Sequence, residues 1–232
     1  MRYQAALRPD WRDSLILNES PLLGSRSGKL LLTGSSKTPP QRRVIMRIEM
    51  AARYALVAYV KNPVGEFVER LRRELHPELP HLAAHVTILP PRCLRGSELS
   101  ALETLEEICG QVSPFEVVLG EVETFVPVTP TVFIRVAHAA YRMRELHDRL
   151  NTNSLAAEEE WPYMPHLTIV KMSAETQADE AYVIARDRWA EFEGSRRIEI
   201  KELTFVREQD ANHWIDLAGV PLGRSLVSPG NR

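Results

Sequence analysis

The sequence His-Val-Thr-Ile at residues 85–88 returns as His-Leu-Thr-Ile at residues 166–169, and this pair of motifs decides the fold. Each copy lies in a short apolar run that predicts a β-strand. Side chains alternate between the two faces of a strand, so residues two positions apart share a face. Each motif therefore presents one imidazole and one hydroxyl side by side, with its aliphatic residues turned to the other face.

The sequence around the motifs indicates an internal duplication. A helix-like stretch and then a strand-like stretch containing Thr-Phe-Val follow each histidine. The two histidines are 81 residues apart, and the corresponding phenylalanines, Phe125 and Phe205, are 80 residues apart. An offset that stays nearly constant across motif, helix and strand predicts a true repeat. If the two motif strands face each other, they line one cleft with two histidines and two threonines.

Strands and helices alternate from residue 51 onward. We predict a strand around each motif, the first of which ends at Pro90-Pro91, and further strands at 54–60, 115–125, 132–136, 197–206 and 213–218. We predict helices at 63–75, 98–110, 138–151 and 174–191. Ser97 and Ser173 are the expected N-caps of the second and fourth helices, and Tyr141 is expected to face inward from the third. Short strand-to-strand turns in both halves favour an α+β fold with mainly antiparallel sheets over a parallel doubly wound sheet.

Composition limits the ligands that the chain attracts. The 232 residues carry a formal charge of −2, which gives no general attraction to polyanions. The arginines occur in small groups, such as Arg72-Arg73, which we expect on solvated helix and loop faces. This balance favours a small or end-on phosphate ligand over a long nucleic-acid duplex.

The chain divides into three parts by composition. Residues 1–45 are rich in Gly, Ser and Pro and predict a flexible N-terminal extension. Residues 46–222 are expected to form a two-lobed domain, with lobes built around the His85 and His166 motifs. Residues 223–232 predict a flexible tail.

Two further features bear on the cell compartment. Cys93 and Cys109 have no metal-ligand spacing and indicate two free thiols in a reducing compartment. No run approaches the ~18 apolar residues that would span a bilayer, and the N-terminus lacks the apolar core of a signal peptide. We therefore predict a cytoplasmic, soluble protein that does not bind membranes.

The motif residues suit acid–base chemistry on a phosphate. Histidine has an unperturbed pKa of about 6.5, so one copy can be neutral while another is protonated near neutrality. A well-placed acid or base contributes roughly 10²–10⁴-fold to a rate. We predict that His85 and His166 form the acid–base pair, and that the hydroxyls of Thr87 and Thr168 bind the phosphate oxygens. Which histidine is the base stays open.

Other histidine chemistry is less well supported by the pattern. Histidine is a common zinc ligand, and His81 precedes His85 by four residues, but no carboxylate or cysteine stands at matching positions of both halves. We therefore predict no metal site. The histidines outside the motifs have no repeated context and are expected at the surface or in packing; they are His76, His81, His138, His147 and His213.

The paired motifs, about eighty residues apart, resemble those of the two-histidine phosphoesterase superfamily, in the branch of 2′-5′ RNA ligase and cyclic phosphodiesterase-like proteins. The resemblance covers roughly residues 51–220. It implies a bilobal fold with pseudo-twofold duplicated lobes, sheets that line a central cleft, and helices outside. It also implies metal-independent cleavage or formation of phosphodiesters, often at 2′,3′-cyclic phosphates or 2′-5′ linkages, with no cofactor.

The resemblance also extends to residues beside the motifs. Relatives often carry an aromatic residue and Pro before the second histidine and a basic residue after it, which Tyr163, Pro165 and Lys171 match. Lys171 lies an odd number of residues after His166, so regular alternation along a strand places it on the opposite face. After the first motif this chain departs from the pattern with Leu-Pro-Pro-Arg, whose Arg92 is a candidate anion contact. Tyr163, Lys171 and Arg92 are thus the possible substrate contacts.

The sequence predicts a monomeric enzyme, a metal-independent phosphodiesterase or 2′-5′ RNA ligase-like hydrolase with a role in RNA processing. Its expected substrate is a small nucleotide or an RNA end that carries a 2′,3′-cyclic phosphate or a 2′-5′ linkage. A non-catalytic module that binds a phosphorylated nucleotide or RNA end is the main alternative. A metal hydrolase and a purely structural role for the histidines are the others.

Overall fold

A computed structural model describes residues 52–76, 82–210 and 213–223, which belong to one unit of the chain, residues 51–232. The elements are β1 (Tyr54–Tyr59), α1 (Pro63–Leu75), β2 (His85–Arg92), α2 (Glu98–Gly110), β3 (Phe115–Thr124), β4 (Thr131–His138), α3 (Ala140–Leu150), the 3₁₀ turn η2 (Asn153–Leu155), β5 (His166–Lys171), α4 (Glu175–Ala190), β6 (Arg197–Ile200), β7 (Glu202–Asp210) and β8 (His213–Pro221). The predicted extension at residues 1–45 lies outside the described residues, as does the predicted tail at residues 223–232 apart from Gly223. None of the described helices is long and apolar enough to cross a membrane.

The eight described strands form one antiparallel sheet in the order β6-β3-β4-β5-β2-β1-β7-β8. This arrangement confirms the predicted α+β fold. The motif strands β2 and β5 are neighbours at the middle of the order, joined through one pair of facing residues, Val86 and Leu167. They divide the sheet into the His166 half (β6-β3-β4-β5) and the His85 half (β2-β1-β7-β8).

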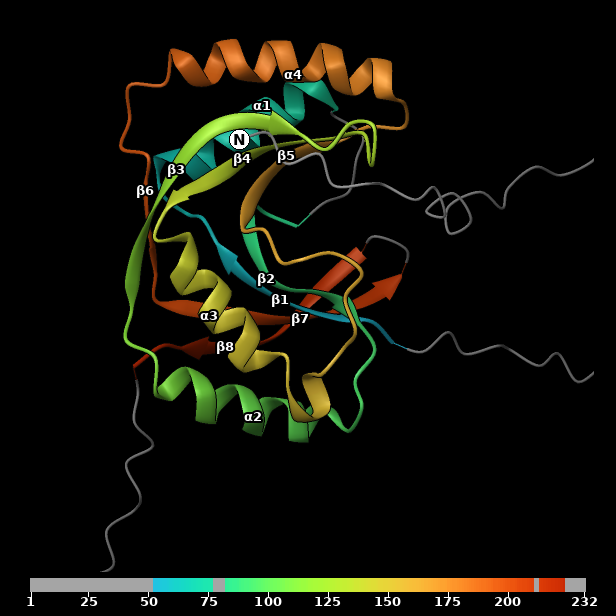
Figure 1. The fold of residues 1–232 in the computed structure, drawn as a ribbon, viewed down its shortest axis with the longest axis vertical. Coiled ribbons are helices and arrows are strands. Elements are labelled where there is room, and N and C mark those ends of the chain that lie inside the picture. Colours follow the sequence, from blue (N-terminus) through green and yellow to red (C-terminus); the bar gives the residue numbers. More distant parts are fainter. Residues whose placement is uncertain (1–51, 77–81, 211–212, 224–232) are drawn as a thin grey trace, which may run out of the picture. The chain divides into compact units, whose positions relative to one another are not determined.

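Each half of the sheet has its own pair of helices on its apolar face. Helices α1 and α4 pack on the His166 half, whereas α2 and α3 pack on the His85 half. Figure 1 shows α1 and α4 together at one end of this unit and α2 at the opposite end. None of the four described helices therefore covers the face that carries the motif histidines.

The two repeats exchange their last strands. The strand order is symmetric about the β5–β2 junction, so β4 corresponds to β1 and β3 corresponds to β7. Yet β3, which ends the first repeat, pairs with β4 of the second, and β7 of the second repeat pairs with β1 of the first. Each half of the sheet is thus built from both repeats, and no single cut in the chain separates the halves.

The helices that begin each repeat bury matching positions. The buried residues Gly65, Val68, Leu71 and Arg72 of α1 correspond, at a constant offset of 75, to the buried residues Ala140, Met143, Leu146 and His147 of α3. Equal spacing on a helix gives an equal buried face. The duplication extends to the packing of these helices, and it pairs a buried arginine with a buried histidine.

Three local predictions are corrected by the structure. Strand β2 continues through Pro90-Pro91 to Arg92, because shifts in its register against β1 leave the prolines outside the regular ladder, where no N–H is needed. Tyr141 is 67% exposed, and Met143 fills the interior instead. Helix α4 is capped at Ala174 without a side-chain hydrogen bond, so Ser173 is not its N-cap.

Candidate active site

The site forms where the two motif strands meet. Val86 and Leu167 face each other and are fully buried, so both point into the core. One residue further along each antiparallel strand, this register sets His85 opposite Thr168 and Thr87 opposite His166. All four side chains lie on the non-core face and are partly exposed. The structure thus brings together the four residues that the motifs predict.

Each imidazole is held in the same way by its own repeat. The Nδ1 atom of His85 lies 2.7 Å from the carbonyl oxygen of Ala83, and Nδ1 of His166 lies 2.7 Å from that of Met164. A carbonyl oxygen only accepts hydrogen bonds, so each Nδ1 carries a proton. The Nε2 atom of each ring is then the one that accepts or gives up a proton.

Both rings are easier to deprotonate than a free histidine. Burial lowers the pKa of His85 to about 4, and the positive charges of Arg72 and His166 act in the same direction, while the bond to Ala83 opposes them. Burial also lowers the pKa of His166, against its bond to Met164. In the absence of substrate, both rings are therefore neutral near pH 7.

Aromatic side chains from β1, from β4 and from the residue that follows β3 pack against the two imidazoles. Tyr59 faces His85 across β1 and β2, with ring centroids 6.4 Å apart, and its hydroxyl donates to Asp216 over 2.6 Å. Phe133 and Phe125 lie 5.1 and 5.2 Å from the His166 ring. These contacts fix the ring orientations and supply the apolar surroundings that lower both pKa values.

A side chain from the opposite repeat binds the backbone of each motif threonine. The guanidinium of Arg72, on α1, donates to the carbonyl oxygens of Thr168 over 2.6 Å and Ile169 over 3.0 Å. The hydroxyl of Tyr163 donates to the carbonyl oxygen of Thr87 over 2.7 Å. Both motifs are therefore fixed by contacts that join the repeats.

The sequence interpretation of Arg72 is wrong. The pattern places Arg72 on a solvated face, but the side chain is only 6% exposed, and it also binds Glu69 over 3.0 Å. A signal for its burial is present in the sequence, because Arg72 continues the i, i+4 spacing of the buried residues Val64 and Val68. A charged residue at a core position of a helix indicates a buried partner.

Tyr163 and Arg92, two of the possible substrate contacts, are engaged within the protein. The Tyr163 hydroxyl is occupied by Thr87, and its ring stacks on His147 at 4.3 Å. Arg92 is 7% exposed, and its guanidinium donates to Pro90, Asn151 and Leu155 and pairs with Glu159. Their geometry assigns Tyr163 and Arg92 to holding the site together rather than to facing a ligand.

Lys171 returns to the face of the site because β5 contains an extra residue. Phe133 of β4 faces Thr168, but Val132 faces Val170, so Ile169 is an insertion in the ladder. Ile169 and Val170 are accordingly both buried. The insertion reverses the strand parity, which puts the exposed Lys171 on the face of His166 and Thr168. If side chains alternated regularly along β5, without the insertion, Lys171 would point away from His166.

The other described histidines do not join the pair. His147 is buried, as expected of a packing residue, and its Nε2 lies 3.1 Å from Glu159. His138 and His213 are exposed, His76 is partly exposed, and His81 lies outside the described residues. Within the described ranges, no group of three or more His, Cys, Asp or Glu side chains is arranged to hold a metal ion.

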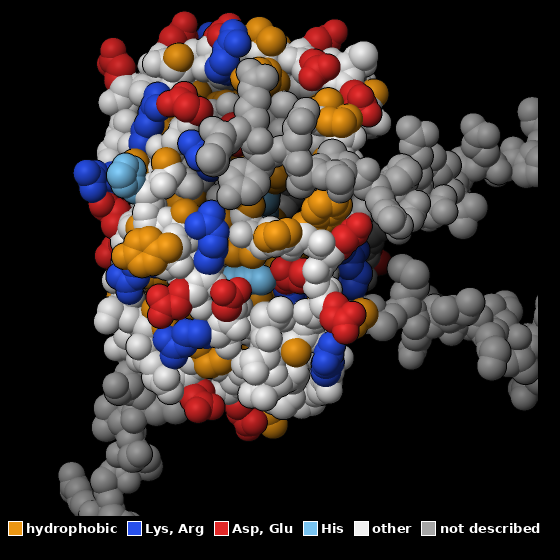
Figure 2. Space-filling model, viewed as in Figure 1, with side chains coloured by type: hydrophobic (Ala, Val, Ile, Leu, Met, Phe, Trp, Pro, Cys, Tyr) orange, Lys and Arg blue, Asp and Glu red, His pale blue; other side chains and the backbone are white. Residues whose placement is uncertain are grey.

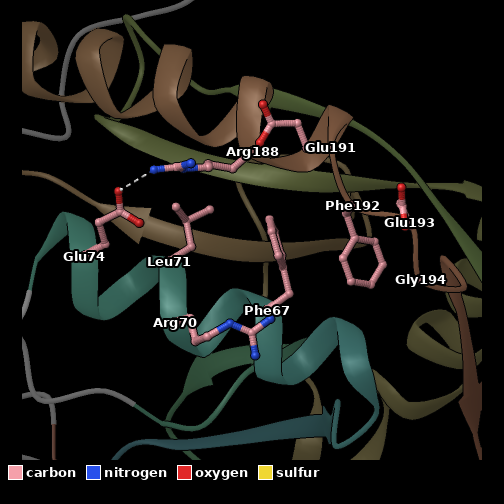
Figure 3. A pocket seen from close by; sticks show the side chains of 9 residues that line it. All are labelled: Phe67, Arg70, Leu71, Glu74, Arg188, Glu191, Phe192, Glu193 and Gly194. Atoms are coloured by element: carbon pink, nitrogen blue, oxygen red, sulfur yellow. Dashed lines mark hydrogen bonds and ion pairs between the residues drawn. The ribbon is translucent and has the colours of Figure 1, made fainter.

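Two cavities lie near α1 rather than around the histidines. The larger, about 550 Å³, lies between α1 and α4, where Phe67 and Phe192 contact each other and Arg188 pairs with Glu74 (Figure 3). The smaller, about 410 Å³, is bounded by the start of α1 and by Ala83-Ala84, directly before His85. Figure 2 shows basic and acidic side chains intermixed over the face in view, without a broad area of one sign there.

Comparison with known sequences gives a consistent result. The model of the 2′-5′ RNA ligase superfamily matches residues 60–212. A protein of Halalkalibacterium halodurans that is named as a phosphoesterase is 30% identical over 118 residues, which are 50% of this chain and 68% of that protein. A similarly named protein of Oceanobacillus iheyensis is 25% identical over 122 residues, or 51% of this chain and 70% of that protein.

Solved structures share the fold. The crystal structure of Escherichia coli LigT in complex with NADP⁺ matches with a TM-score of 0.51 at 15% identity, over 74% of this chain and 98% of that one. A protein of Thermus thermophilus matches with a TM-score of 0.50 at 15% identity, over 74% of this chain and 98% of that one. At these identities the likeness concerns the fold alone.

Proposed function

The chain belongs to the 2′-5′ RNA ligase superfamily of phosphoesterases, and from this premise we propose that it is a metal-independent phosphodiesterase for 2′,3′-cyclic phosphates or 2′-5′-linked nucleotides and RNA ends. The observation that carries the proposal is the matched state of the two rings. Each binds a backbone carbonyl oxygen through Nδ1 over 2.7 Å, so each offers Nε2 from the same face of the sheet.

In the proposed hydrolysis, the two imidazoles act on opposite sides of one phosphorus atom. One Nε2 removes a proton from water as the water oxygen bonds to phosphorus. The other, protonated, ring gives its proton to the ribose oxygen as the bond from that oxygen to phosphorus breaks. Water is thereby added across one P–O bond, and the product is a phosphomonoester. The reverse transesterification, with a ribose hydroxyl in place of water, would form a linkage.

The lowered pKa values agree with this division of roles once the substrate is bound. A phosphodiester anion between the rings favours the charged form of a neighbouring histidine, because an opposite charge raises its pKa. The bound substrate thus supplies the protonated ring that the free protein lacks near neutral pH. The second ring stays neutral and serves as the base.

The threonines and Lys171 have proposed roles on the phosphate itself. The hydroxyls of Thr87 and Thr168 share the face of the histidines, and neither donates to another described residue. They would donate to the non-bridging oxygens, where negative charge increases in the transition state. Lys171, on the same face, would contribute a positive charge to a substrate phosphate.

The decisive experiment incubates the purified protein with a 2′,3′-cyclic mononucleotide in the presence of a chelator. We expect turnover by the wild type, and a loss of roughly 10²–10⁴-fold in both His85→Asn and His166→Asn, as for removal of a general acid or base. Unchanged melting temperatures would exclude a merely structural role for the rings. Binding of the nucleotide without turnover would favour the binding module, and turnover that needs added zinc would favour the metal hydrolase.

A further inference from the structure

The smaller cavity at the start of α1 has an excess of positive charge. Lys61, Arg70 and Arg73 line it together with Glu66 and Glu69. The Glu69 carboxylate is already bound by Arg72 over 3.0 Å and by the N–H of Ala84. This leaves three cations against one carboxylate, that of Glu66.

All three cations lack an ionic partner within the described part of the chain. Lys61, Arg70 and Arg73 are exposed, and none makes an ion pair with another described residue. Arg70 lines the larger cavity as well, but there Arg188 pairs with Glu74 over 3.4 Å, and Glu191 and Glu193 add negative charge (Figure 3). Of the two cavities, the smaller is therefore the one that suits an anion.

The smaller cavity adjoins the turn that holds His85. Ala83 and Ala84 line it, and the carbonyl oxygen of Ala83 is the partner of His85 Nδ1. Lys61 lies two residues beyond the end of β1, and its ammonium is 5.9 Å from the centre of the Tyr59 ring, which lies 6.4 Å from that of His85. A substrate that leaves the histidine pair along the end of β1 thus passes Tyr59 and reaches Lys61.

From this placement we infer that the cavity of Lys61 and Arg70 binds a second phosphate of the substrate, that of the nucleotide next to the scissile linkage. The inference rests on the proposed function and narrows it. The preferred substrate is then an oligoribonucleotide end rather than a mononucleotide, because only the oligonucleotide carries a phosphate that reaches this cavity.

The test compares two substrates in two charge-matched variants. The substrates are a 2′,3′-cyclic mononucleotide and a pentaribonucleotide that ends in a 2′,3′-cyclic phosphate. Lys61→Gln/Arg70→Gln removes the two cations, and Arg186→Gln/Lys201→Gln removes two exposed cations elsewhere, each of which pairs with a carboxylate on the surface. The measured quantity is the ratio of kcat/KM for the oligonucleotide to that for the mononucleotide.

We expect the wild type to favour the oligonucleotide, and the ratio to fall roughly tenfold in Lys61→Gln/Arg70→Gln, as for the loss of two exposed charge pairs. The dependence of the oligonucleotide rate on salt should become shallower, by about 0.7 in log–log slope for each lost phosphate contact. The control variant should keep the wild-type ratio. A ratio near one in the wild type, or an equal fall in both variants, would overturn the inference.

Failure of the proposed function would be seen separately, as no turnover of either substrate by the wild type. Fluorescence anisotropy with a labelled pentaribonucleotide 3′-phosphate then decides the matter. Weaker binding by Lys61→Gln/Arg70→Gln than by the control variant supports a phosphate site at this cavity. Equal affinities contradict it.

Discussion

Arg72 and Thr168 come from different repeats, and a 2.6 Å hydrogen bond from the Arg72 guanidinium to the Thr168 carbonyl oxygen joins them. The hydroxyl of Tyr163 makes the corresponding contact with Thr87 in the other direction. The two threonine carbonyls are thus bound by different chemical groups, although the motifs are alike. In both repeats the carbonyl oxygen of the motif threonine accepts a hydrogen bond from a side chain, but the donor is an arginine in one repeat and a tyrosine in the other.

Replacing Arg72 should strongly destabilise the fold. Arg72→Ala removes a cationic partner of Glu69 and leaves the carbonyl oxygens of Leu82, Thr168 and Ile169 with fewer donors. This costs about 3 kcal/mol or more in the free energy of unfolding. Urea denaturation of the purified variant measures this cost. Arg70→Ala, an exposed neighbour on the same helix, should stay within about 0.5 kcal/mol of the wild type. Equal stability of the two variants would show that the buried contacts of Arg72 contribute little.

The motif threonines should act through their hydroxyls. Thr87→Val and Thr168→Val keep the shape of the side chain but remove a donor to the phosphate, so kcat/KM should fall by about 10²–10³-fold in each. Thr→Ser at either position keeps the hydroxyl and should recover most of the activity. Assays with a 2′,3′-cyclic nucleotide test this, and full activity in both valine variants would remove the threonines from the mechanism.

Lys171 should contribute to substrate binding through its position after the inserted residue Ile169. Lys171→Gln should raise KM by roughly three- to tenfold, in the range of an exposed charge pair, and the effect should shrink at high salt. Lys201→Gln, at an exposed position paired with Glu199, is the matched control. Identical steady-state kinetics of the Lys171 variant and the wild type would mean that the side chain is only solvated.

The activity should be highest below the usual histidine range. The free protein needs one neutral and one protonated ring, and burial lowers the pKa of His166 and brings that of His85 to about 4. The protonated fraction therefore declines as pH rises above these values, so kcat/KM should be bell-shaped with its maximum below about pH 6.5. A kcat/KM profile with its maximum at neutral or alkaline pH would contradict these environments.

Stability should change with pH in the opposite sense to that of a salt-bridged histidine. A ring with a lowered pKa in the folded state binds fewer protons than in the unfolded chain, so the unfolding free energy rises with pH between about 4 and 6.5. Urea denaturation across this window measures the slope. His85→Gln removes one titrating ring and should flatten the curve; an unchanged slope would indicate that His85 titrates normally.

Much of the architecture follows from periodic patterns. The four helices begin and end within about two residues of their predicted bounds, because amphipathic spacing is a strong local signal. The pairing of β3 with β4 and of β7 with β1, unlike the helix bounds, does not follow from a local pattern. It depends on which strand edges remain free after the repeats meet, and the sequence pattern carries no information on that choice.

The site residues also fall into those predicted by a local rule and those that depend on long-range contacts. The motifs predict His85, Thr87, His166 and Thr168 on one face, because strand alternation is a local rule. Lys171 depends on an insertion in the ladder between β4 and β5, and such insertions arise from pairing rather than from propensity. The burial of Arg92 depends on Glu159, which lies 67 residues away in the chain. Long-range partners of this kind become visible only when the strands are assembled.

The exchange of β3 and β7 between the repeats has a consequence for the origin of the protein. A half-length chain consisting of β1, α1, β2, α2 and β3 would leave the outer edge of β1 without a partner strand. Its own β3 would be free to pair with the β1 edge of a second copy. Two identical copies would form a dimer by exchanging their β3 strands, and their two histidines would lie together at the twofold axis. The present chain has the arrangement expected of such an ancestral homodimer after gene fusion, with the segment between β3 and β4 as the seam.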